Sequence, residues 1–154
     1  MEVGTGSFAE LKYLTIRDGH VENSHGGGGN SGAGLYVSRE AKVRAYFVNI
    51  TGNTAVRNSG AGIVNFGELY MEDCNISDNK VEDPTGAQQF FHGGGLLNIG
   101  HAELNRVSII DNKAEQGGAI SASNSRVMRE LTGVPVYTKL NAVTIKGNVA
   151  SWEA

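Results

Sequence analysis

Two aspartates at equivalent places in neighbouring copies of a short repeat are the clearest candidates for metal binding in this sequence. Asp78 and Asp111 each precede an asparagine that closes a row of the repeat. If neighbouring rows are stacked strands, the two backbones lie about 4.8 Å apart, so both carboxylates could reach one Ca²⁺ ion. However, Lys80 and Lys113 share the same corner, and aspartate is a favoured turn residue. We therefore expect no metal cofactor, with Ca²⁺ at Asp78 and Asp111 as the alternative.

Carboxylates that could carry out acid–base catalysis do not recur as pairs. Polysaccharide hydrolysis needs two or three carboxylates that project from one face. Glu68, Glu72 and Asp73 lie close together, but basic and neutral residues hold the matching positions of the adjacent rows. No row presents a complete acid–base constellation, which favours a non-catalytic protein. The alternative is a lyase, hydrolase or epimerase that acts on acidic glycans in a groove.

Composition and charge exclude several classes of function. The chain has 154 residues, a net charge of −3 with both signs interspersed, and one cysteine. It therefore lacks the basic stripe of a nucleic-acid-binding protein and has no internal disulfide from which a redox compartment could be read. No apolar run is long enough to cross a bilayer. The length corresponds to a single domain, residues 1–154.

The candidate residues are positioned by a row that occurs five times. Each row begins apolar–polar–apolar, which is the pattern of a β-strand with one buried face. The later rows close with Ile-x-x-Asn, as in 76–79 and 109–112. The rows begin at Leu14, Val48, Cys74, Val107 and Val143.

A second strand follows each glycine-rich opening, at 32–35, 60–63, 93–96 and 117–120. One copy, from Gly93 to the next opening at Gly117, is about two dozen residues long and cannot bury its apolar positions alone. A third short strand fits between these two. The sequence therefore predicts an all-β parallel β-helix, a solenoid of about five coils with three short strands in each coil.

The closing asparagines predict a structural ladder at one corner of the coils. Asparagine tolerates turn conformations, and its amide can pair with the amide one coil away. In the first row Gly19 stands in place of asparagine, so the ladder should begin one coil later. Its predicted members are Asn53, Asn79, Asn112 and Asn148.

Three residues in the outward position of the glycine-led strand form a candidate interaction surface. Tyr36, Val64 and Leu97 would place a row of large apolar side chains on the outside of the solenoid, which suggests a covered face. Either a partner protein covers it, or an insertion such as Gln88–Phe91 packs onto it.

The motifs resemble those of a known family. Gly117–Ile120 matches the Gly-Gly-Ala-[Ile/Leu/Val] motif of chlamydial polymorphic outer-membrane protein repeats, and the Ile-x-x-Asn closures resemble the Phe-x-x-Asn motif of that family. The resemblance covers nearly the whole chain. It implies a right-handed β-helix like those of pectate lyases and autotransporter passengers, and it favours an extracellular or cell-surface location.

The ends of the solenoid lead to an expectation about function. Open strand edges pair with other chains unless they are capped, and only Trp152 is a visible cover. We therefore expect a non-catalytic structural or recognition module that is a piece or subunit of a larger assembly. Its partners would be other protein chains, bound by end-on stacking or lateral docking, with polysaccharide as a further possibility.

Overall fold

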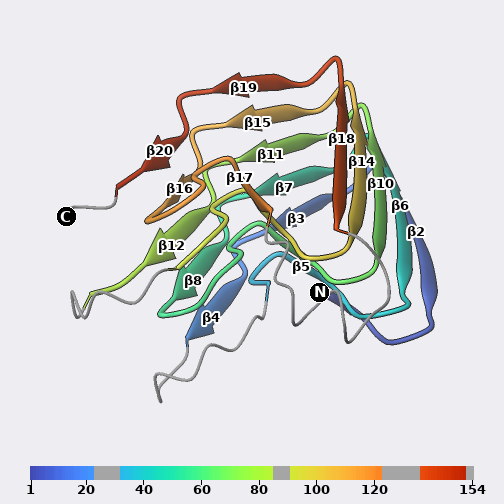
Figure 1. Ribbon diagram of the computed structural model, residues 1–154, viewed down its shortest axis with the longest axis horizontal. Helices are drawn as coiled ribbons and strands as arrows, with labels where there is room; N and C mark the ends of the chain where they lie inside the picture. The colour runs from blue at the N-terminus through green and yellow to red at the C-terminus, as the bar shows by residue number, and fades with distance from the viewer. Residues whose placement is uncertain (23–31, 85–90, 123–135, 152–154) are drawn as a thin grey trace.

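The computed structural model describes residues 1–22, 32–84, 91–122 and 136–151, and they form a right-handed parallel β-helix (Figure 1). The strands of these residues belong to four parallel sheets of five strands each, which we call sheets A to D. Each coil contributes one strand to each sheet, in the order A, B, C, D. The coils are numbered 1 to 5 along the chain.

Sheets A and B form two sides of every coil. Sheet A consists of β1 (Glu2–Val3), β5 (Leu35–Val37), β9 (Ile63–Asn65), β13 (Leu96–Asn98) and β17 (Ile120–Ala122). Sheet B has the longest strands, which are β2 (Phe8–Lys12), β6 (Lys42–Tyr46), β10 (Glu68–Glu72), β14 (His101–Asn105) and β18 (Tyr137–Asn141).

Sheets C and D complete the coil. Sheet C consists of β3 (Thr15–Arg17), β7 (Asn49–Thr51), β11 (Asn75–Ser77), β15 (Ser108–Ile110) and β19 (Thr144–Lys146). Sheet D consists of β4 (His20–Glu22), β8 (Thr54–Val56), β12 (Lys80–Glu82), β16 (Lys113–Ala114) and β20 (Val149–Ala150).

The expectation of three strands in each coil was wrong, because sheet D adds a fourth. Four of its strands directly follow a closing asparagine, and β4 follows Gly19. They are short, but each places a small or branched apolar residue on the inner side, and that position is the signal that marks them. These residues are Val21, Ala55, Val81, Ala114 and Ala150. Coil 1 also contributes a strand to sheet A, since β1 pairs with β5.

The core is a column of stacked aliphatic side chains that runs along the solenoid axis. Strands of adjacent coils pair without a register shift, so like residues lie above one another. Ile50, Ile76 and Ile109 are fully buried in this way. Burial of each such side chain contributes about 1.5–3 kcal/mol. Ile145 continues the column in coil 5 but is 51 % exposed, because no described coil lies above it.

Two corners of each coil use the left-handed backbone conformation. The corner between sheets B and C does so at Tyr13, Phe47, Asp73, Arg106 and Ala142, all with φ between 50° and 54°. The corner between sheets C and D does so at Asp18, Gly52, Asp78, Asp111 and Gly147. Non-glycine residues rarely adopt this conformation, so the repeated corner geometry overrides local preference.

The ladder asparagines are hydrogen bonded from coil to coil. Asn53 Nδ2 donates to Asn79 Oδ1 at 2.8 Å, Asn79 Nδ2 to Asn112 Oδ1 at 2.9 Å, and Asn112 Nδ2 to Asn148 Oδ1 at 2.9 Å. Each acceptor oxygen also receives the backbone N–H of the asparagine one coil below. At the start, Gly19 N donates to Asn53 Oδ1 at 2.9 Å, so the ladder begins in coil 2.

The glycine column makes room for this ladder. A Cβ atom on Gly34 would lie 2.9 Å from Asn53 Nδ2, and one on Gly62 would lie 3.0 Å from Asn79 Nδ2. Each would also meet a backbone carbonyl of the next coil. These positions therefore require glycine, because the ladder amides occupy the space that a side chain would fill.

We expect loss of one ladder amide to be strongly destabilising. Asn79→Ala removes the acceptor of the buried Asn53 backbone N–H and takes one amide donor each from Asn112 Oδ1 and the Ile50 carbonyl, and should lower the free energy of unfolding by roughly 3 kcal/mol. The matched control is Asn75→Ala, at a half-buried asparagine in the same coil, which should change stability by about 0.5 kcal/mol or less. Urea unfolding followed by circular dichroism measures both, and equal effects would contradict the ladder's role.

A second prediction tests the glycine column. Gly62→Ala forces a Cβ against the Gly95 carbonyl and the Asn79 amide, so we expect a loss of roughly 2 kcal/mol or more. Gly4→Ala, with no atom within 4 Å of its new Cβ, should leave stability unchanged or raise it by up to about 1 kcal/mol. Thermal unfolding measures the stability of both variants. A Gly62→Ala protein as stable as the parent would show that the predicted steric clash does not occur.

Candidate binding face

The two aspartates proposed as metal ligands are exposed turn residues. Asp78 and Asp111 have φ values of 56° and 54° and occupy the same corner as Gly52 and Gly147. Their recurrence therefore follows from the turn geometry, which asparagine, aspartate and glycine tolerate best. No group of three or more His, Cys, Asp or Glu side chains suited to a metal ion occurs among the residues that the structure describes.

The row proposed as an interaction surface is mostly covered. Val64 and Leu97 are 0 % and 3 % exposed, and Tyr36 is half-buried beside Phe66, with ring centroids 5.7 Å apart. The row is therefore covered within the chain itself, and Val64 and Leu97 are not available at the surface to a partner protein. Of the segment Gln88–Phe91, only Phe91 lies in the described residues. It is buried in a second small core with Ala55 and Val81.

Sheet B has the longest strands, and alternate side chains of each strand point to its outer side. We call its outer side the sheet-B face. Its residues stand in three columns across coils 1 to 5. The columns are Phe8, Lys42, Glu68, His101 and Tyr137; then Glu10, Arg44, Tyr70, Glu103 and Lys139; and then Lys12, Tyr46, Glu72, Asn105 and Asn141.

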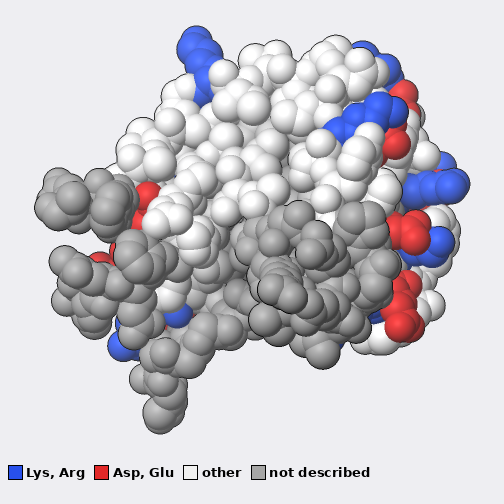
Figure 2. Space-filling model, in the orientation of Figure 1, with Lys and Arg blue, Asp and Glu red and all other residues white. Residues whose placement is uncertain are grey.

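Charge on the sheet-B face is dense but balanced. Figure 2 shows Lys, Arg, Asp and Glu side chains interspersed over the strands of this sheet. Its four cations and four carboxylates cancel when histidine is neutral. They are Lys12, Lys42, Arg44 and Lys139 against Glu10, Glu68, Glu72 and Glu103. Lys42 Nζ lies 3.0 Å from Glu68, and Lys139 Nζ lies 2.9 Å from Glu103. The face therefore presents many hydrogen-bond donors and acceptors and carries no net charge.

Aromatic rings lie between these charges. The rings of Tyr46 and Tyr70 are tilted, with centroids 5.8 Å apart, and the guanidinium of Arg44 lies 5.9 Å from the Phe8 ring centroid. Phe8 is 61 % exposed. Aromatic side chains at a surface offer apolar area to a ligand at little entropic cost, because binding fixes only two side-chain torsions.

A shallow hollow of about 560 Å³ opens among these residues. It crosses β2, β6, β10 and β14, and the rings of Phe8, Tyr46 and Tyr70 line it together with charged side chains. Val43 and Leu69 form its floor. A ligand-sized depression with apolar walls and convergent polar groups is the usual form of a binding site.

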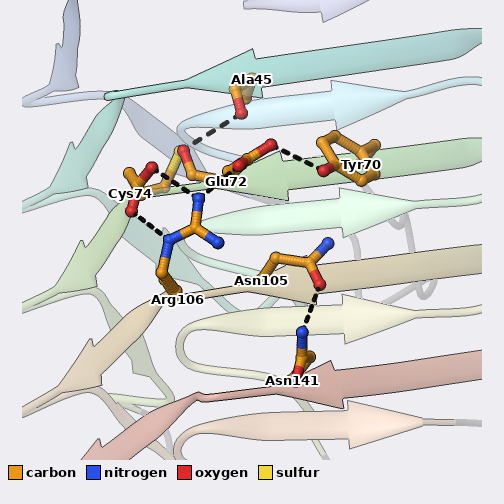
Figure 3. Close-up of polar contacts among 8 residues, drawn as sticks. Ala45, Tyr70, Glu72, Cys74, Asn105, Arg106 and Asn141 are labelled. Carbon is orange, nitrogen blue, oxygen red and sulfur yellow. Dashed lines mark hydrogen bonds and ion pairs between the residues drawn. The ribbon is translucent and has the colours of Figure 1, made fainter.

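One edge of the face is held by an arginine network (Figure 3). Arg106 Nε and Nη2 donate to the two carboxylate oxygens of Asp73 at 2.8 and 2.9 Å, and Nη2 also donates to Glu72. Tyr70 OH donates to the other Glu72 oxygen at 2.7 Å. The Tyr70 hydrogen bond, followed by Arg106, lowers the pKa of Glu72, and Arg106 lowers the pKa of Asp73.

Two neighbours of this network are structural. Cys74 is buried, its Sγ lies 3.1 Å from the Glu72 carbonyl, and desolvation raises the pKa of its thiol. Asn141 Nδ2 donates to Asn105 Oδ1 at 3.2 Å, which links coils 4 and 5 (Figure 3). An unreactive thiol and an amide pair add order to the edge but no chemistry of their own.

Sequence reasoning missed a second asparagine pair at the corner between sheets A and B. Asn65 and Asn98 are fully buried, and Asn65 Nδ2 donates to Asn98 Oδ1 at 2.8 Å. Each Oδ1 accepts the N–H of the glycine two residues later. The repeated Asn-x-Gly at 65–67 and 98–100 is the sequence signal. The sheet-B face was missed as well. It is formed by the outward-pointing residues of five separate strands, and no local motif marks them.

No protein-family model, curated protein or solved structure matches this chain. No helix in the described residues is long and apolar enough to cross a membrane. The function proposed below therefore rests on the geometry of the sheet-B face.

The arginine network yields a prediction about protonation. Arg106→Gln should raise the pKa of Asp73 toward its ordinary value of about 4, and that of Glu72 by less, because the Tyr70 hydrogen bond remains. A carboxyl group whose pKa is lowered in the folded state stabilises the fold at pH values above its ordinary pKa. This contribution is lost as the pH falls through the folded-state pKa. The stability gap between the parent and the variant should therefore narrow in acid.

Carboxyl-carbon NMR titration measures the two pKa values directly. Lys139→Gln is the matched control, because it removes the ion-pair partner of Glu103 and should leave the pKa values of Glu72 and Asp73 unchanged. Identical Asp73 titration curves in the parent and Arg106→Gln would contradict the assignment.

Proposed function

We propose that this protein is a non-catalytic recognition module that binds an uncharged oligosaccharide on its sheet-B face. The observation that carries the proposal is the concentration of exposed and half-buried aromatic rings and mutually neutralising charges around one shallow hollow. The solenoid presents this face as a regular surface of five parallel strands, which suits an extended ligand better than a compact one.

The aromatic rings support a sugar ligand in particular. The C–H faces of pyranose rings are apolar, while their edges carry hydroxyl groups that both donate and accept. Phe8, Tyr46 and Tyr70 supply the apolar area, and the neighbouring carboxylates and basic side chains supply hydrogen-bond acceptors and donors.

The charge balance favours an uncharged glycan over an acidic one. An acidic polymer needs cations in excess, as phosphate and uronate recognition both rely on unpaired basic groups. On this face, Lys42 and Lys139 are paired with carboxylates, and the total is neutral. A neutral glycan meets no net repulsion and gains from the aligned donors and acceptors.

The state of the carboxylates supports binding without catalysis. A glycosidase needs one carboxyl group with a raised pKa as its proton donor. The pKa of Glu72 is lowered by Tyr70 and Arg106, and that of Glu103 is lowered by Lys139. Both are therefore ionised at neutral pH and held by partners.

The repeat motifs support a setting for this module. The likeness of Gly117–Ile120 and the Ile-x-x-Asn closures to chlamydial surface-protein repeats supports an extracellular or cell-surface role in adhesion, with the module acting inside a larger assembly. The pectate-lyase-like alternative, an enzyme acting on acidic glycans, has no comparable support from the face.

Binding to defined sugars tests the proposal. Isothermal titration with neutral hexasaccharides of glucose, mannose and xylose should give saturable binding, and oligogalacturonate should bind at least tenfold more weakly. Phe8→Ala and Tyr70→Ala should each weaken binding about tenfold or more, as expected for loss of about 1.4 kcal/mol. Tyr13→Ala, at an exposed ring off this face, is the matched control and should bind as the parent does.

Three results would overturn the proposal. They are the absence of binding to every neutral sugar, a preference for oligogalacturonate, and equal binding by the Tyr70→Ala and parent proteins. Release of new reducing ends from any of these sugars would replace a binding module with an enzyme.

A further inference from the structure

The hollow on the sheet-B face is elongated along the solenoid axis. Phe8 and His101 stand at its two ends, in the same column of side chains but in coils 1 and 4. Three coil spacings separate them, which is about 14 Å. Apart from Tyr46, the walls are two columns whose members are two residues apart on each strand, and this places the walls only about 6.6 Å apart. A chain-like ligand that fills the hollow therefore crosses the strands and lies parallel to the solenoid axis.

Each of coils 2 to 4 supplies one polar group to either wall. The two groups of a coil flank an inward-pointing residue, so both project outward. Lys42 and Glu68 lie 3.0 Å apart along one wall, so their ion pair does not bridge the hollow. Both walls therefore offer hydrogen-bond partners at a repeat of one coil. The pairs are Lys42 with Arg44, Glu68 with Tyr70, and His101 with Glu103.

Aromatic rings mark both ends of the hollow. The Phe8 ring stands at coil 1 and is largely exposed. The ring of His101 stands at coil 4 and packs against that of Tyr137, with the two centroids 4.7 Å apart. Between these ends, Tyr70 contributes a ring to one wall. A sugar unit at either end of the hollow therefore has an apolar ring to pack against.

The coil spacing matches one class of neutral glycan. In cello-oligosaccharides, equatorial bonds join the glucose units into an extended ribbon, and each unit advances the chain by about one coil spacing, ~4.8 Å. The ribbon carries hydroxyl groups along both edges. In malto-oligosaccharides an axial bond makes the chain curl. Only the extended ribbon keeps its hydroxyl groups in step with the polar groups of both walls.

We propose that the sheet-B face binds an extended, equatorially linked neutral glycan along the solenoid axis, with one sugar unit over each of coils 1 to 4. This inference rests on the function proposed above and adds the linkage, direction and length of the ligand. Phe8 and His101 pack against the two end units. The paired polar groups of coils 2 to 4 bind hydroxyl groups on both edges of the chain.

A length series of cello-oligosaccharides tests this placement. Isothermal titration should give affinities that rise about threefold or more with each unit from two to four. Affinity should change less than about twofold from four units to six, because the hollow ends at coil 4. Maltohexaose should bind at least tenfold more weakly than cellohexaose. The same length series in equatorially linked mannose and xylose is read by the same criteria.

A variant at one end of the hollow tests the position of the chain. His101→Ala should weaken cellotetraose binding about threefold or more and leave cellobiose binding within about twofold, because two units still fit over coils 2 and 3. His20→Ala, at an exposed histidine of sheet D, is the matched control and should bind both sugars as the parent does. Amide NMR shifts caused by cellotetraose should extend across β2, β6, β10 and β14.

The outcomes separate this inference from the proposed function. Equal binding of cellohexaose and maltohexaose, a plateau at two units, or amide shifts confined to one strand would overturn the inference and leave a module that binds neutral sugars. An equal loss of cellobiose and cellotetraose affinity in His101→Ala would do the same. The absence of binding to every neutral sugar would overturn the proposed function, and this inference with it.

Discussion

The asparagine ladder and the glycine column that faces it are the constraint on which the rest of the molecule depends. A buried amide with four hydrogen-bonding positions is stable only if nearly all of them are filled. Asn79 meets this condition by accepting two bonds from Asn53 and donating to Ile50 and Asn112. The arrangement works only when coils repeat at strand spacing and when Gly62 has no side chain. Coil spacing, register and composition are therefore linked at one corner.

The positive-φ corners follow from the same repeat. In coils 1 to 4, the turn between sheets B and C is held by a hydrogen bond to the next coil, such as Phe47 N to the Glu72 carbonyl at 3.1 Å. Once stacking fixes these bonds, the side chain at the corner is free to vary. Tyrosine, phenylalanine, aspartate, arginine and alanine all occur there. In coils 3 and 4, the corner residues Asp73 and Arg106 pair with each other, so the turn column also fixes one edge of the sheet-B face.

The face and the open end of the solenoid have different physical origins. The sheet-B face exists because five-residue strands in exact register bring like positions together, so that residues about two dozen or more positions apart form columns. Its balanced charges and tilted rings are properties of the side chains. The exposed layer at coil 5 is a property of the backbone and core, since any coil of this solenoid presents the same groups until another coil covers it.

Local pattern alone determined the coils, the inward columns, the ladder corner and its start after Gly19, because strand alternation and turn chemistry are short-range effects. Sheet D was missed because its strands are only two or three residues long and have no motif of their own, unlike the glycine openings and Ile-x-x-Asn closures that marked sheets A and C. Burial of Val64 and Leu97, exposure of Ile145, and the convergence of Phe8, Tyr46 and Tyr70 on one hollow depend on which segments cover which layers. Tertiary structure alone decided these features, because solvent exposure and cross-coil distances are set by the packing of residues far apart in the chain.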